Sequence, residues 1–159
     1  MKKNIYKFLF IGLALCWMGI IFYFSHQTGD SSSKMSGKIT DHIIQCFVPN
    51  YENLSTIEQN KIFTNTSYII RKLAHYSEYA VLGALLFLAV SRFTDRQSIQ
   101  LGVSSVLGIL YALSDEFHQS FVGGRSPMLK DVLIDSFGLL TMLFFICCII
   151  NFRKRKKKR

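Results

Sequence analysis

Four long apolar stretches separate the polar segments of this chain. They cover residues 5–24, 73–90, 99–117 and about 127–151. A helix rises about 1.5 Å per residue, so about 20 apolar residues cross the roughly 30 Å hydrocarbon core of a membrane. Each stretch is close to that length. The pattern predicts an all-α, multi-pass membrane protein with four transmembrane helices.

The first apolar stretch follows Lys2 and Lys3, as the apolar part of a signal peptide would. It is too long for that part, and "FYF" leads directly into "SHQ" without a small-x-small cleavage site. We therefore expect it to be retained as a transmembrane helix.

The long connection between the first two stretches has helical patterns of its own. After Ser31-Ser32-Ser33, Met35, Ile39, Ile43 and Phe47 recur every four residues until a proline stops the pattern. This predicts an amphipathic helix that lies in the membrane interface or covers the end of the bundle. Ser55 and Glu58 have the spacing of a capping box, which predicts a further helix able to continue into the second apolar stretch.

Composition and charge fix the orientation that we expect. Half of the residues are apolar and the mean hydropathy is positive, which is unusual for a soluble domain of this size. Four spans put both termini on one side, and the flanks on that side, with the loop 91–98, hold 12 of the 19 basic residues. The positive-inside rule makes that side cytoplasmic. The amphipathic segment between the first two spans is then extracytoplasmic.

The basic tail, 153–159, carries seven basic residues directly after the last apolar stretch. Such a run is attracted to anionic lipid at the cytoplasmic surface, and we prefer this interpretation to nucleic-acid binding.

Ionisable and polar residues gather where the predicted topology places the outer ends of the four spans. A scatter of polar residues along the spans would not produce this convergence, and ionisable groups at membrane depth indicate a functional site. The candidate site residues are Ser25, Gln27, Arg71, Lys72, His75, Glu78, Tyr79, Tyr111, Asp115, Glu116, His118, Gln119, Arg125, Asp131 and Asp135.

Helical spacing sorts these residues into faces. Arg71, His75, Glu78 and Tyr79 share one stripe of the second span. Asp115, His118 and Gln119 share a face with Tyr111, whereas Glu116 points toward another helix. Asp131 and Asp135 are one turn apart, and Gly138 one turn later would allow another helix to approach closely.

The turn before the last span is also readable. Ser126 suits an N-cap and Pro127 the first helical position, which puts Asp135 roughly 12 Å into the helix. Gly123 and Gly124 would let the turn fold back and place Arg125 over the carboxylates.

Several functions fit such a cluster. It can be a packing network without a ligand. It can bind zinc through His75, Glu78, His118 and one aspartate, although the spacing is not diagnostic. It can act by acid–base chemistry on a lipid-linked substrate, with arginines holding phosphate. A transport path is less well supported, because the inner half of the last span is nearly uniformly apolar.

Four segments carry a family resemblance. They are "FSHQ" (24–27), "RKLAHYSEYAVLGALL" (71–86), "YALSDEFHQSFVGGR" (111–125) and "DVLIDSFG" (131–138). In this order they resemble the VanZ-like family of small bacterial membrane proteins, named for a teicoplanin-resistance determinant. Gly123 departs from the family pattern, which has proline there. The segment 31–61 and the basic tail lie outside these motifs.

The resemblance implies a VanZ-like transmembrane domain over residues 1–152, in the bacterial cytoplasmic membrane, connected with lowered teicoplanin susceptibility. We expect its polar pocket to face outward and to bind a lipid, a cell-wall precursor or an amphiphilic glycopeptide antibiotic, without a cofactor unless zinc binds. The main alternative is a membrane enzyme acting on a lipid-linked envelope intermediate. The oligomeric state is left open.

Overall fold

The structure is a computed structural model that describes residues 2–124 and 128–157. The described residues form helices and no strand. Four of these helices are long and apolar enough to cross a membrane, which confirms the predicted all-α, multi-pass fold. The elements in order are α1 (Lys2–Ser25), α2 (Gly29–Phe47), the 3-10 turn η1 (Tyr51–Asn53), α3 (Thr56–Val90), α4 (Gln97–Gln119) and α5 (Leu129–Lys157).

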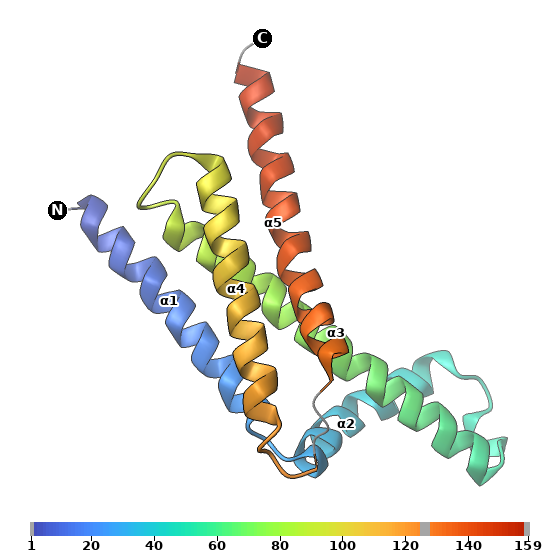
Figure 1. The fold of residues 1–159 in the computed structure, drawn as a ribbon. Helices are drawn as coiled ribbons and strands as arrows, with labels where there is room; N and C mark the ends of the chain where they lie inside the picture. Colours follow the sequence, from blue (N-terminus) through green and yellow to red (C-terminus); the bar gives the residue numbers. More distant parts are fainter. Residues whose placement is uncertain (1, 125–127, 158–159) are drawn as a thin grey trace.

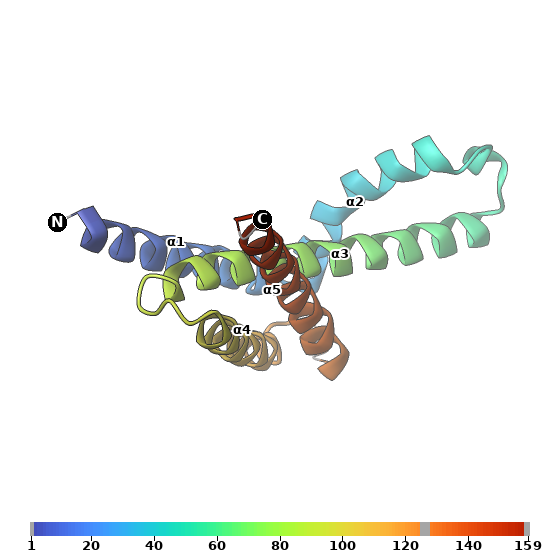
Figure 2. The same ribbon diagram turned by 90° about the horizontal axis from the view of Figure 1, so that it is seen from above.

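The four long helices form a bundle with an arm. In Figures 1 and 2, α1 lies along α3 and runs in the opposite direction. The helices α4 and α5 lie beside each other, and α3 crosses both of them obliquely. Both termini and the α3–α4 connection lie at one end of the bundle, which we call the terminal end. The α1–α2 and α4–α5 connections lie at the other, which we call the polar end. The first half of α3 and the whole of α2 extend sideways from the polar end as the arm.

The arm exists because α3 is longer than a membrane span. Its 35 residues extend about 53 Å at 1.5 Å per residue, against roughly 30 Å of hydrocarbon. The predicted capping box begins it: the Glu58 carboxylate accepts from the Ser55 N–H at 3.0 Å, and Ser55 Oγ accepts from the Glu58 N–H at 3.4 Å. The helix predicted at Ser55 therefore continues without a break into the second apolar stretch.

The α2 helix differs from its prediction at both its start and its face. It begins at Gly29, because Thr28 rather than the serine cluster caps it and accepts from the Ser31 N–H. It lies beside α3 (Figure 2), and Ser36 Oγ is 3.0 Å from Ser67 Oγ of α3. The buried face carries Ser36 and Thr40 together with Ile44, whereas the predicted apolar stripe is open: Met35 is 49% and Ile39 is 54% exposed.

Glycines bring α3, α4 and α5 close together. A Cβ on Gly138 would lie 2.2 Å from the carbonyl oxygen of Tyr76, so α5 meets the backbone of α3 there. Leu139 is fully buried and fills the space beside Gly83 and Gly108. The close helix approach predicted at Gly138 is confirmed.

The last helix begins two residues later and ends six residues later than predicted. The turn residues Arg125, Ser126 and Pro127 lie outside the described part of the chain, and α5 begins at Leu129. Asp135 is therefore about 9 Å into the helix. At its other end, α5 continues through most of the basic tail to Lys157.

Candidate functional site

A buried hydrogen-bond network joins α1 to α4 at the polar end. Ser25 Oγ donates to Asp115 Oδ2 at 2.7 Å, and Gln119 Nε2 donates to the same oxygen at 3.0 Å. The Gln119 amide also lies 3.3 Å from Ser25 Oγ. All three side chains are buried. We call them the Ser25–Asp115–Gln119 network, and its geometry is that of an interhelical packing contact.

Two histidines extend this α1–α4 contact toward the surface. His26 Nδ1 and His118 Nε2 are 3.1 Å apart, so one ring donates and the other accepts. The Phe22 ring lies 4.4 Å from the His118 ring, centroid to centroid. The sequence placed His118 on the polar face correctly, but it did not identify His26 as its partner.

Two aromatic side chains connect α1 to α3 and α4 through hydrogen bonds to backbone carbonyl groups. Tyr111 OH donates to the carbonyl oxygen of Met18 at 2.6 Å, and Trp17 Nε1 donates to the carbonyl oxygen of Glu78 at 2.9 Å. Tyr111 thus reaches the candidate site from the expected face, and its hydroxyl hydrogen-bonds to α1.

Two further contacts fix the start of α5. Lys72 of α3 forms an ion pair with Asp131. Glu116 Oε1 of α4 accepts from the Met128 N–H at 2.6 Å, just before the helix begins. Glu116 therefore does point away from Asp115 and toward a neighbouring helix, as its spacing predicted.

His75 lies between two carboxylates. Its Nδ1 atom is 3.9 Å from Glu78 Oε2 and 3.9 Å from Asp135 Oδ1. Asp135 is 2% exposed, and its Oδ1 atom has no hydrogen-bond partner among residues 2–124 and 128–157. A carboxylate with these surroundings is costly at membrane depth. Tyr79 is buried beside this group, 6.1 Å from Tyr111 between ring centroids.

The face of α3 that carries Arg71, His75 and Glu78 also borders a cavity of about 290 Å³, which we call the arm cavity. Arg71, His75 and Glu78 supply its ionisable lining. Met35 and Ile39, from the open stripe of α2, supply apolar lining. The cavity is therefore amphiphilic: all of its ionisable side chains come from α3, and its two exposed apolar side chains from α2 lie opposite them.

The sequence missed the apolar half of this cavity. Phe24, Ile70 and Ala74 also line it, together with Ser32 and Ser36. The four-residue apolar repeat of α2 indicated that Met35 and Ile39 share a face. The repeat does not indicate which residues of α3 lie opposite that face. Gln27 lies just before α2 and its backbone N–H donates to the Phe24 carbonyl at 3.3 Å. Arg125, the other loop candidate, lies outside the described residues.

Metal ligands do not converge within the described segments. No group of three or more His, Cys, Asp or Glu side chains is arranged there to hold a metal ion. His118 pairs with His26, whereas His75 and Glu78 line the arm cavity. Zinc binding stays a prediction.

The comparison with family models decides the family. The VanZ/LLP1 model matches residues 10–151. The chain belongs to the VanZ/LLP1 family. The match includes the segment 31–61, which the quoted motifs left outside, so the arm is part of the family domain, whereas the basic tail lies beyond the match. No curated protein and no solved structure matches the chain.

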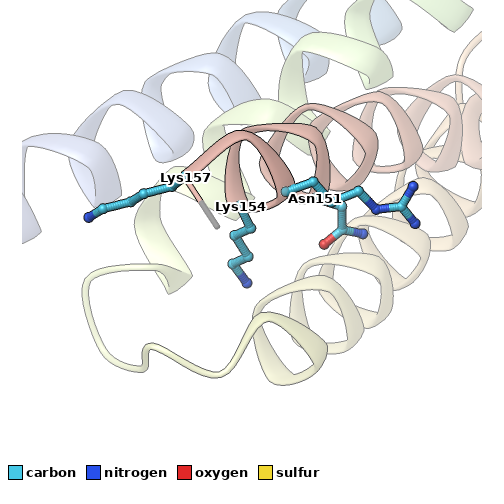
Figure 3. A pocket seen from close by; sticks show the side chains of 4 residues that line it. Asn151, Lys154 and Lys157 are labelled. Atoms are coloured by element: carbon cyan, nitrogen blue, oxygen red, sulfur yellow. The ribbon is translucent and has the colours of Figure 1, made fainter. Parts of the chain in front are cut away.

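A separate hollow of about 580 Å³ lies at the terminal end of this VanZ/LLP1 protein. It is lined by Asn151, Lys154, Arg155 and Lys157 of α5 (Figure 3). Lys154 Nζ donates to Gln97 Oε1 of α4 at 2.9 Å. All four lining residues are exposed, so this basic hollow is a surface feature remote from the polar end.

Proposed function

We propose that the chain binds an amphiphilic molecule of the bacterial envelope in the arm cavity. The observation that supports this is the lining of the cavity: Arg71, His75 and Glu78 on α3 face Met35 and Ile39 on α2. A ligand with a charged group on a hydrocarbon chain can satisfy both sides at once. A purely polar or purely apolar ligand matches only one side of the cavity.

The side chains indicate the chemistry of the charged group. Arg71 offers a planar fork of donors suited to phosphate or carboxylate, and a protonated His75 adds a second cation. Glu78 accepts from hydroxyl, amide or ammonium groups of the same ligand. A phospholipid, a lipid-linked cell-wall precursor and a lipidated glycopeptide antibiotic all combine such groups with an acyl or prenyl chain.

The expected topology puts the arm cavity at the extracytoplasmic surface of the bacterial cytoplasmic membrane, where all three classes of ligand are found. Binding of the antibiotic, or of the precursor that it targets, lowers the amount of antibiotic–target complex. The proposed consequence is lowered susceptibility to teicoplanin.

Filling the cavity tests this proposal. Met35→Trp places a large side chain in the cavity without touching its charged groups, and we expect it to restore teicoplanin susceptibility in cells that express the protein. Ile43→Trp is the matched control, because Ile43 lies on the same stripe of α2 but does not line the cavity. Protein abundance is measured for both variants. Equal susceptibility of the two variants at equal abundance would refute the binding proposal.

A second candidate function is acid–base catalysis on a lipid-linked intermediate. It is favoured by His75, which lies 3.9 Å from both Glu78 and the buried Asp135, so that a proton acceptor and a proton donor adjoin the cavity. Catalytic hydrogen bonds are often long before the substrate binds.

Mass spectrometry of lipid extracts separates the two candidates. An enzyme changes the pool of lipid-linked intermediates, and Asp135→Asn abolishes that change at unaltered protein abundance. A binding protein leaves the lipid pool chemically the same in cells with the wild-type protein and in cells without it.

A further inference from the structure

A third hollow lies toward the terminal end of the bundle, away from the arm cavity. It has a volume of about 320 Å³ and is bounded by α1, α3 and α4. Ala14 and Ala89 are buried in it, and their small side chains leave the space open. Leu15 and Leu107 are exposed on its rim, so the hollow opens to the surrounding membrane. We call it the α1–α3–α4 groove.

Two cations stand at one end of this apolar groove. The Arg92 guanidinium carbon is 4.7 Å from the centre of the Phe10 ring, and Lys7 Nζ is 5.0 Å from the centre of the Phe93 ring. Phe93 itself lines the groove. Cation–π contacts of this length hold the two charged groups in place beside its mouth.

No carboxylate neutralises these two cations in the part of the chain that the structure describes. Among residues 2–124 and 128–157, neither Lys7 nor Arg92 forms an ion pair. The Nε atom of Arg92 is buried without a hydrogen-bond partner in that same part of the chain. A buried guanidinium donor without a partner is costly unless an external acceptor meets it.

We propose that the groove is a binding site for one anionic phospholipid, with the phosphate at Arg92 and Lys7 and one acyl chain along Ala14, Leu86 and Ala89. The apolar lining alone cannot select a lipid, because acyl chains surround every membrane helix. Selection comes from the cations, since each Lys or Arg near the surface favours an anionic headgroup about fivefold. The guanidinium adds a forked contact to phosphate oxygens.

This site differs from the basic tail in what it recognises. The tail presents many exposed charges to any anionic surface, whereas the groove joins two oriented cations to a space for hydrocarbon. The tail binds a membrane surface, and the groove holds an individual lipid.

Native mass spectrometry of the purified full chain tests the proposal. Phosphatidylglycerol and phosphatidylcholine are added in turn, and the lipid that stays bound is counted. We expect one phosphatidylglycerol to be retained, with at least a tenfold preference over phosphatidylcholine. Arg92→Gln should lower that preference about fivefold. Arg96→Gln is the matched control, because Arg96 is exposed in the same connection, whereas Arg92 is partly buried and held against Phe10 beside the groove.

A groove-filling variant tests the acyl chain separately from the headgroup. Leu107→Trp acts on an exposed rim residue, so the fold is kept, and it should release phosphatidylglycerol with both cations still present. Unchanged retention in Leu107→Trp would overturn the proposal. So would equal retention of the two lipids, an equal loss in Arg96→Gln and Arg92→Gln, or a lipid-free dimer in which a second copy covers the groove.

Discussion

The Ser25–Asp115–Gln119 network and the lining of the arm cavity contain similar residues in opposite situations. In the network, a carboxylate, a hydroxyl and an amide are buried together and joined by hydrogen bonds of 2.7 to 3.3 Å. In the cavity, Arg71, His75 and Glu78 face an open space, and the distances from His75 to its carboxylates are 3.9 Å. Polar residues thus join two helices by hydrogen bonds in one place and line an open cavity in the other.

The difference arises from which helices meet. In the network, α1 and α4 are in direct contact, so their polar side chains form hydrogen bonds with each other. The arm cavity forms where α2 packs on α3 through Ser36 and Thr40, which leaves the apolar stripe and the charged stripe on either side of a gap. Substitutions in the two regions should therefore affect different quantities.

The largest effect should come from Gly138→Val, which removes both regions at once. The Gly138 Cβ position is 2.2 Å from the Tyr76 carbonyl, so α5 cannot approach α3 with a side chain there. We expect a loss of more than about 4 kcal/mol and no folded protein in membranes. Gly12→Val is the control, because nothing lies within 4 Å of its Cβ position. Equal abundance of the two variants, measured by immunoblot, would contradict the packing described here.

Asp115→Ala should break the network and leave the cavity lining intact. It removes the buried acceptor to which both Ser25 Oγ and Gln119 Nε2 donate, and the cost of losing it is about 2–3 kcal/mol. Thermal unfolding in detergent measures this loss. Asp95→Ala, at an exposed residue, serves as the control. A melting temperature unchanged by Asp115→Ala would mean that the network does not hold α1 to α4.

Asp135→Asn should separate stability from function. The buried Oδ1 atom lacks a hydrogen-bond partner within residues 2–124 and 128–157, so a neutral amide of the same shape removes a buried charge. We expect unchanged or higher stability, by up to about 2 kcal/mol, together with loss of the cellular effect.

Asp131→Asn is the comparison for that variant, because Asp131 is paired with Lys72. Its stability should fall by about 1 kcal/mol. Thermal unfolding measures the stability of both variants. An equal loss of stability in Asp135→Asn and Asp131→Asn would show that Asp135 serves helix packing.

The sequence predicted the charged stripe of α3 better than it predicted the contacts between α1 and α4. Hydrophobic length predicted the four spans, and helical spacing predicted the stripe of Arg71, His75 and Glu78, because both depend on one helix at a time. The partners of Ser25 and His26 lie about ninety residues away on α4, and no spacing within one helix encodes them.

The orientation of α2 shows why the arm cavity could not be foreseen. In water, the stripe containing Met35 and Ile39 would pack against protein. At a membrane, lipid covers an apolar stripe equally well, and small polar residues such as Ser36 allow the closer helix contact. The hydrophobic pattern therefore predicted the helix but not the face it buries.

The smallest effect should come from Lys154→Gln, a polar contact outside both regions. Lys154 Nζ donates to Gln97 Oε1 in an exposed position, so its loss should change the free energy of unfolding by less than about 0.5 kcal/mol. Chemical denaturation in mixed micelles measures it. A larger loss would show that α4 and α5 depend on this contact at the terminal end.

Photocrosslinking in cells tests the arm cavity most directly. A photoreactive amino acid is placed at Ile39, which lines the cavity, or at Ile43, on the same stripe outside it, and the captured amphiphiles are identified by mass spectrometry. We predict one enriched amphiphile at Ile39, which disappears when Glu78→Gln and Arg71→Gln are added, and only bulk phospholipid at Ile43. The same unselective phospholipid mixture at both positions would contradict the account.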